Sequence, residues 1–156
     1  CIRDRRKHTI SEFFYRTQHI QQLGGYQIYP AGYYADDASI LLFCNNNGIA
    51  STEESLIVYR KSENNISSSS CWNVEKSKAA LKYYQWIIDE FPMKQQDEQI
   101  IQQRLDFDLY TYFSAALNIH QSIQILNCIP VNIWNWKKKL LCLYKFILNS
   151  YAKQIK

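Results

Sequence analysis

The adjacent carboxylates Asp36 and Asp37 are the residues of this chain whose types and spacing best fit catalysis. They lie between aromatic residues and a short apolar run, in the sequence YYADDASILLFC. Carboxylate oxygens are the ligands that Mg²⁺ prefers, so such a pair can belong to a metal site. An aspartate pair before an apolar run is also typical of a polar turn that leads into a buried strand. The rest of the chain decides between these two interpretations.

A second segment, NVEKSK, adds to the first, because Lys76 lies 39 residues after Asp37. YADD followed by ILLFC, together with this later segment, resembles the palm of reverse transcriptases from non-LTR retroelements over residues 33–78. The resemblance implies that the aspartates sit on a hairpin turn and hold Mg²⁺ against the incoming phosphates. It also implies that Asp36 is the metal-binding carboxylate with Asp37 as its neighbour, and that Lys76 is a late palm residue.

A complete polymerase site does not fit into this chain. The resemblance implies that two-metal chemistry also uses a further aspartate from an earlier strand. Only 35 residues precede Asp36, and the acids among them, Asp4 and Glu12, lie on no convincing strand. Residues 29–34, YPAGYY, place proline and glycine where the family has an apolar strand. We therefore predict no catalytic residue and favour a protein without enzymatic activity. Two alternatives stay open for the resemblance: a truncated or co-opted palm fragment that binds nucleic acid, with Mg²⁺ at Asp36 and Asp37, or a chance match.

Residues 134–156 form a basic, aromatic segment with six lysines and no acid. Leu140, Tyr144 and Ile147 recur at helical spacing, which predicts an amphipathic helix over residues 134–155. Such a helix can dock on a partner protein, lie on an anionic membrane surface or follow the phosphates of RNA. It can also close the chain's own core, with its lysines in solvent. The residues that we predict to bind a partner are Trp134, Trp136, Lys137, Lys138, Lys139 and Tyr144.

The N-terminal half, residues 1–60, combines one helical pattern with short β-prone runs. A helix is predicted over residues 9–25, with Thr9 and Glu12 as a capping box and Gly24-Gly25 as its stop. The three β-prone runs cover residues 26–29, 39–44 and 55–60. Residues 61–72 are polar and low in complexity, which predicts a loop or linker.

The C-terminal half, residues 73–156, is predicted to be helical. The first helix begins at Asn73 as N-cap and ends before Pro92, and a longer helical stretch over residues 95–127 breaks near Asn118. The predicted fold class is therefore α+β, with a small β-containing N-terminal half that includes one helix, and a helical C-terminal half that ends in a basic amphipathic helix. The alternative domain organisation is one continuous domain over residues 1–156.

Composition excludes several classes of protein. Hydrophobic residues make up 47% of the 156 residues, which excludes wholesale disorder and is enough for a core. No apolar run approaches the roughly 18 to 20 residues of a membrane span, so no transmembrane segment is predicted. The five cysteines are too far apart for a CxxC metal or redox element, and their odd number makes a poor disulfide framework. Reduced thiols favour an intracellular location.

The function that these observations favour is a non-catalytic accessory or structural subunit that binds other proteins within a large assembly. The chain begins with Cys1 instead of Met, which we interpret as a processed or incomplete N-terminus, and we expect an organelle, such as the mitochondrion, as its location. No cofactor is expected outside the Mg²⁺ of the palm alternative. A peripheral membrane or RNA-binding module that acts through residues 134–156 is the third hypothesis.

Overall fold

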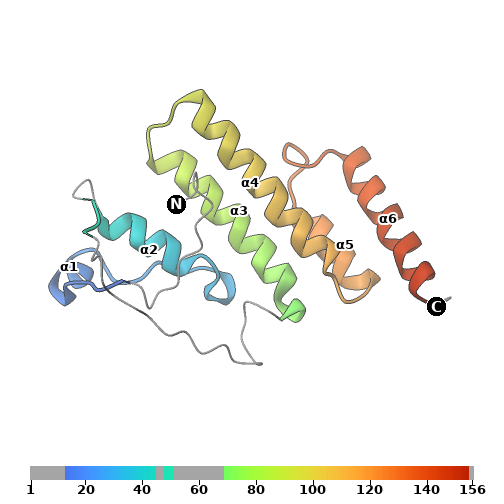
Figure 1. The fold of residues 1–156 in the computed structure, drawn as a ribbon, viewed down its shortest axis with the longest axis horizontal. Coiled ribbons are helices and arrows are strands. Elements are labelled where there is room, and N and C mark those ends of the chain that lie inside the picture. Colours follow the sequence, from blue (N-terminus) through green and yellow to red (C-terminus); the bar gives the residue numbers. More distant parts are fainter. Residues whose placement is uncertain (1–12, 45–47, 51–68, 155–156) are drawn as a thin grey trace.

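All regular structure in the described part of the chain is helical (Figure 1). The structure is a computed structural model that describes residues 13–44, 48–50 and 69–154, with side chains described up to residue 150. In chain order the elements are α1 (Thr17–Gln22), the 3₁₀ helix η2 (Pro30–Gly32), α2 (Ala35–Cys44), the 3₁₀ helix η3 (Ser70–Trp72), α3 (Asn73–Glu90), α4 (Gln95–Ser114), α5 (Ile119–Cys128) and α6 (Trp136–Gln154). The predicted α+β fold class is therefore wrong, because the described residues are mostly helical and contain no strand.

Neither of the two predicted strands that the structure describes is formed. Residues 27–29 have no regular structure, and residues 39–44 belong to α2, while the third predicted strand, 55–60, lies outside the described residues. A short apolar run occurs both in buried strands and in buried helices, so its periodicity does not separate the two. Asp36 and Asp37 occupy the first turn of α2, where carboxylates stabilise the positive end of a helix. The same aspartates that suggested a turn before a strand therefore help to begin a helix.

The N-terminal helix is shorter than the sequence predicts. α1 spans Thr17–Gln22, and residues 13–16 before it have no regular structure. Its predicted capping box, Thr9 and Glu12, lies outside the described residues. The predicted stop is confirmed, since Gly24 and Gly25 have φ angles of 81° and 89°, which glycine adopts without steric cost.

The helices of the C-terminal half are confirmed, with one change of role at an end. The predicted break near Asn118 separates α4 from α5, and the Asn118 side chain accepts a hydrogen bond from the backbone N–H of Gln121 at 2.9 Å. Asn73, predicted as an N-cap, is instead the first residue of α3. Its side-chain amide donates to the carbonyls of Tyr112 and Ala115, at 3.1 Å each, so it joins the start of α3 to the end of α4. Those carbonyls need such a partner because a helix end leaves them unpaired. Of the predicted linker 61–72, the structure describes residues 69–72, which lead through η3 into α3.

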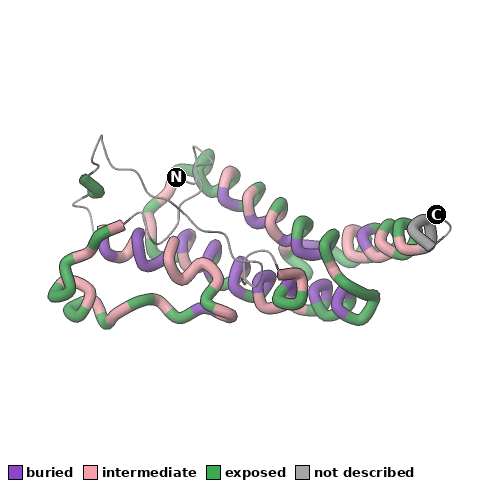
Figure 2. Tube along the Cα trace, turned by 60° about the horizontal axis from the view of Figure 1, so that its bottom comes forward, coloured by how far each residue is buried: buried purple, intermediate pink, exposed green. Residues whose placement is uncertain are grey.

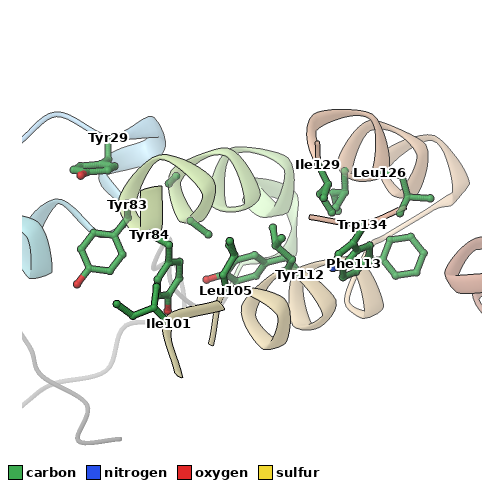
Figure 3. Close-up of a cluster of buried hydrophobic side chains, with 14 of the residues drawn as sticks. Tyr29, Tyr83, Tyr84, Ile101, Leu105, Tyr112, Phe113, Leu126, Ile129 and Trp134 are labelled. Carbon is green, nitrogen blue, oxygen red and sulfur yellow. The ribbon is translucent and has the colours of Figure 1, made fainter. Parts of the chain in front are cut away.

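α3 is the centre of the fold and packs against α4, α5 and η2. Ala79 and Ala80 are fully buried on α3, and their small side chains let the neighbouring elements approach closely. Large side chains fill the rest of one continuous core, which runs from Tyr29 past Tyr83 and Tyr84 towards Trp134 (Figure 3). Figure 2 shows the buried positions along α2, α3 and α4, with exposed positions on their outer sides.

α6 lies at one end of the molecule, and α1 and α2 lie at the other (Figure 1). The main neighbour of α6 among the described helices is α5. The inner side of α6 supplies Cys142, which is buried, and Leu143 and Phe146, which are half-buried against the core. The Phe146 ring meets Phe113 of α4 edge-on at 5.9 Å between ring centroids. α6 is thus anchored along one side only, as the last helix of the described array.

Candidate functional site

Asp36 and Asp37 lie at the start of a helix and not on a turn between two strands. α2 follows directly after an irregular turn in which Ala31 and Tyr34 have positive φ angles of 52° and 66°. Such angles are uncommon for residues other than glycine, and a bulky residue adopts them only where its surroundings hold it. The backbone conformation of Tyr34, directly before the helix that carries the aspartates, therefore depends on contacts with neighbouring elements.

Those contacts come from a set of aromatic and carboxylate side chains that we call the tyrosine cluster. It consists of Tyr33, Tyr34, Tyr83, Tyr84, Tyr112 and Asp108, which α3, α4 and the turn before α2 bring together. The Tyr34 ring stacks on Tyr83 with 4.7 Å between ring centroids and an interplanar angle of 18°. Its hydroxyl donates to Asp108 Oδ2 at 2.8 Å and lies 3.0 Å from the Tyr112 hydroxyl. Tyr34 is held by both its ring and its hydroxyl.

Asp108 is the acceptor at the centre of this cluster. Its Oδ2 atom also accepts the hydroxyl of Tyr84 at 2.6 Å, and its Oδ1 atom lies 3.7 Å from Arg104 Nε. Burial, before any other cause, raises the pKa of Tyr34 and Tyr84. Both hydroxyls therefore keep their protons and act as donors. A carboxylate that accepts two buried phenol protons next to an arginine is a charge-assisted network that stabilises the junction of α2, α3 and α4.

Asp37 lies beside this network without an ion-pair partner among the described residues. Burial, followed by the charges of Asp36 and Asp108, raises the pKa of Asp37 to about 6. Asp37 is thus affected by the charges of the other two aspartates, yet no group of three or more His, Cys, Asp or Glu side chains in the described part of the chain is arranged to hold a metal ion. The Mg²⁺ site at Asp36 and Asp37 consequently has no support from the geometry and stays a hypothesis of the palm alternative.

The variant Asp37→Asn is expected to raise the stability of the chain at pH 7 by about 1 to 3 kcal/mol and to flatten its pH dependence. The pKa of Asp37 is higher in the folded chain than its ordinary value of 3.8. The stability that its proton provides is therefore complete below about pH 4 and is lost as the pH rises through about 6. Denaturant unfolding of both proteins at steps between pH 4 and 7.5 measures this slope.

The matched control is Asp97→Asn, which removes an exposed carboxylate from the first turn of another helix, α4. Because the Asp97 side chain is exposed, we expect the free energy of unfolding of this control at pH 7 to stay within about 0.5 kcal/mol of the wild type. An Asp37→Asn protein with the same slope as the wild type would contradict the assignment of the raised pKa to Asp37.

The two segments of the palm resemblance do lie together in the structure. The Lys76 ammonium group lies 5.3 Å from the centroid of the Tyr33 ring, so the start of α3 contacts the turn before the aspartates. Lys76 is buried and donates to the carbonyl of Ser69 at 2.9 Å. The hairpin that the resemblance implies is absent from residues 33–44, since the residues of its turn and of the strand after the aspartates form α2. The proximity is therefore part of helix packing.

Three of the six residues predicted to bind a partner make contacts within this chain. Trp134 is fully buried before α6 begins, and its indole N–H donates to Asp106 Oδ1. Lys138 also donates to Asp106 Oδ1 and lies 4.6 Å from the centroid of the Trp134 ring. Lys139 donates to the carbonyl of Ile129, just after α5. Trp134 is thus covered by the chain itself, and the half-buried Lys138 and Lys139 side chains both donate to other groups of the chain.

The other three predicted residues lie on the outer side of α6. Trp136 is 61% exposed and Tyr144 is 60% exposed, and Lys137 lies 5.7 Å from the centroid of the Trp136 ring. Further large apolar side chains lie exposed on the same helix: Leu140, Leu141, Ile147 and Leu148. At 100° per residue these side chains occupy one continuous arc of roughly 140°. We call this arc the outer face of α6.

The sequence stripe that predicted α6 belongs to this outer face and not to the core. Leu140, Tyr144 and Ile147 recur at helical spacing, yet their side chains are 56%, 60% and 37% exposed. The side chains that anchor the helix, Cys142 and Phe146, lie on the opposite side. α6 is therefore apolar on both sides, a pattern that a helix normally shows when it is covered on both sides. An amphipathic pattern alone does not reveal which of two apolar sides faces inward.

Comparisons with protein-family models, with curated proteins and with solved structures yield no match to this chain. Within the ranges that the structure describes, no helix has both the length and the apolar character required to cross a bilayer. The geometry of the chain itself therefore carries the functional interpretation.

Proposed function

We propose that this chain is a non-catalytic subunit that binds another protein of a larger assembly through the outer face of α6. The observation that carries the proposal is the continuous exposed arc of Trp136, Leu140, Leu141, Tyr144, Ile147 and Leu148. Soluble chains rarely expose so many neighbouring apolar side chains unless another molecule covers them. Trp136 and Tyr144, which belong to the residue types enriched among the hot spots of protein interfaces, lie within the arc.

The engagement of the lysines favours protein binding over the phosphate-binding alternatives. Lys138 and Lys139 donate to groups of the chain itself, so among the lysines with described side chains on α6, Lys137 and Lys145 remain for a partner. A nucleic acid or an anionic bilayer is held mainly by many free cationic groups. An apolar arc with two such lysines among the described side chains of α6 fits the interface of a protein better, where a partly apolar core meets a polar rim.

The double variant Tyr144→Ala/Leu148→Ala is expected to lower the amount of co-purifying partner at least tenfold, because hot-spot side chains at the centre of an interface each contribute about 2 kcal/mol or more. The full chain is tagged, expressed in its source cells and captured together with its bound proteins, which are quantified by mass spectrometry. The free energy of unfolding is expected to stay within about 0.5 kcal/mol per substitution, because both side chains are exposed.

The matched control is Phe107→Ala/Ile123→Ala, which removes two exposed apolar side chains from α4 and α5. A protein that is lost from the α6 variant and kept by this control is the partner that the proposal requires. Equal retention by all three proteins would contradict the proposal. So would a wild-type chain that retains no partner and remains a stable monomer.

A further inference from the structure

The outer face of α6 has the geometry that another helix recognises. Trp136, Leu140, Tyr144 and Leu148 follow one another at intervals of four residues, so their side chains form a single ridge along the helix. Ridges at this spacing fit into the groove between side-chain rows of a neighbouring helix. At 1.5 Å per residue, α6 offers a ridge of roughly 20 Å, which matches three to four turns of a partner helix.

The charge beside this ridge has one sign. Residues 134–156 contain no acid, and the first turn of α6 carries none either. Lys137, Lys138 and Lys139 instead lie at the end of the helix that already has a partial positive charge. Asp106 neutralises Lys138, and the carbonyl of Ile129 accepts a hydrogen bond from Lys139. Lys137, in the first turn, and Lys145, two turns later, therefore supply positive charge at the outer face.

We infer that the partner presents an acidic amphipathic helix, which lies along the outer face of α6 and extends the array α3–α6 by one helix. The inference rests on the proposed function and names the chemistry of its partner. The apolar side of the partner helix covers the ridge, and its carboxylates lie opposite Lys137 and Lys145. These lysines are about 12 Å apart along the helix, so the carboxylates are expected 7 or 8 residues apart.

Charge complementarity decides between this occupant and a second copy of the chain. Two α6 helices in contact would place lysines near lysines, without an acid from residues 134–156 to separate them. Like charges in contact across an interface disfavour the wrong partner. An acidic helix instead places carboxylates opposite Lys137 and Lys145 and neutralises their positive charge.

Two synthetic peptides test the inference. Both have the same 21-residue helical design with one Leu stripe, and one carries Glu and the other Lys at the positions beside the stripe. Fluorescence anisotropy with the full chain is expected to show tighter binding of the Glu peptide, weakened by salt. Lys137→Glu and Lys145→Glu are each expected to weaken binding of the Glu peptide about three- to tenfold and to strengthen binding of the Lys peptide. Lys94→Glu, an exposed lysine just before α4, is the charge-matched control and is expected to change neither.

The outcomes separate the inference from the proposed function. If both peptides bind equally, and if capture of the natural partner depends on Tyr144 and Leu148 but not on Lys137, Lys145 or salt, the acidic helix is refuted and the docking function stands. If the Tyr144→Ala/Leu148→Ala variant also keeps its partner, the docking function fails as well. A concentration-dependent dimer through α6 in light scattering would make the occupant a second copy. Sedimentation with anionic vesicles that requires the same residues would make it a membrane surface. Either result overturns the inference.

Discussion

Trp134→Ala is expected to lower the free energy of unfolding by about 3 to 5 kcal/mol, the range found when a large buried aromatic side chain is removed from a core. Trp134 is fully buried where the end of α4, α5 and the start of α6 meet. Its ring lies edge-on to Phe113 with 6.5 Å between centroids, and its indole N–H donates to Asp106. The variant leaves a cavity and also removes the surface on which the Lys138 side chain lies.

Trp136→Ala is the control for this prediction, because the chain provides a second tryptophan two residues later. Its side chain is 61% exposed, so the substitution is expected to change the free energy of unfolding by no more than about 0.5 kcal/mol. Urea unfolding followed by far-ultraviolet circular dichroism measures both variants without relying on tryptophan fluorescence. Equal losses in the two variants would contradict the burial of Trp134. The capture experiment with the proposed partner is expected to show an effect of Trp136→Ala, because the exposed Trp136 side chain belongs to the outer face of α6. The substitution with the small effect on stability is thus expected to lower the amount of captured partner.

Asp108→Ala is expected to cost about 3 kcal/mol, because hydrogen bonds to charged groups contribute more than neutral ones and buried donors without partners are costly. The substitution leaves the hydroxyls of Tyr34 and Tyr84 without their shared acceptor. It also removes the carboxylate that forms an ion pair with Arg104. Tyr34 is held with a positive φ angle by this network, so the turn before α2 is expected to loosen first.

Two further variants make this second prediction specific. Asp108→Asn keeps an acceptor oxygen and is expected to lose less stability than Asp108→Ala. Asp89→Ala removes an exposed acid near the end of α3 and is expected to stay within about 0.5 kcal/mol of the wild type. Unfolding by urea gives the free energies, and a double-mutant cycle with Tyr34→Phe gives the coupling of the pair. An absence of coupling would show that Asp108 and Tyr34 stabilise the fold independently.

The sequence predicted the helical half of the fold because its signals are local. Pro92 ends a helix, Asn118 begins one and glycines stop another, each through backbone chemistry within a few residues. The α2 segment was misassigned because a short apolar run has no period that separates a strand from a buried helix. Tertiary contacts decide between a strand and a helix for this segment. The Ser39 hydroxyl donates to the Ala35 carbonyl at 2.6 Å and accepts the N–H of Gln27 at 2.9 Å, and Ala38 is fully buried.

In the candidate site, the sequence pattern likewise does not predict which side chains are buried. Trp134 and Trp136 look equivalent in the sequence, yet one fills the core and the other lies at the surface. Their difference depends on where α6 begins: Asn135 Oδ1 accepts the backbone N–H of Lys138 at 2.9 Å, so the helix starts at Trp136 and leaves Trp134 in the preceding turn. The tyrosine cluster was also not predicted from the sequence, because Asp108 and Tyr34 are 74 positions apart and only the fold brings them together. The sequence contains twelve tyrosines, but it does not indicate which of their hydroxyls share a carboxylate.

The apolar outer face of α6 also bears on how long the chain survives in a cell. A chain without its partner presents this face to chaperones and proteases, which act on exposed apolar segments. A partner that binds only the folded chain adds stability by mass action, about 2.7 kcal/mol when its free concentration is 100 times the Kd. If the proposed partner covers α6, the abundance of this chain is expected to follow the abundance of that protein. Depletion of that protein would then shorten the half-life of this one.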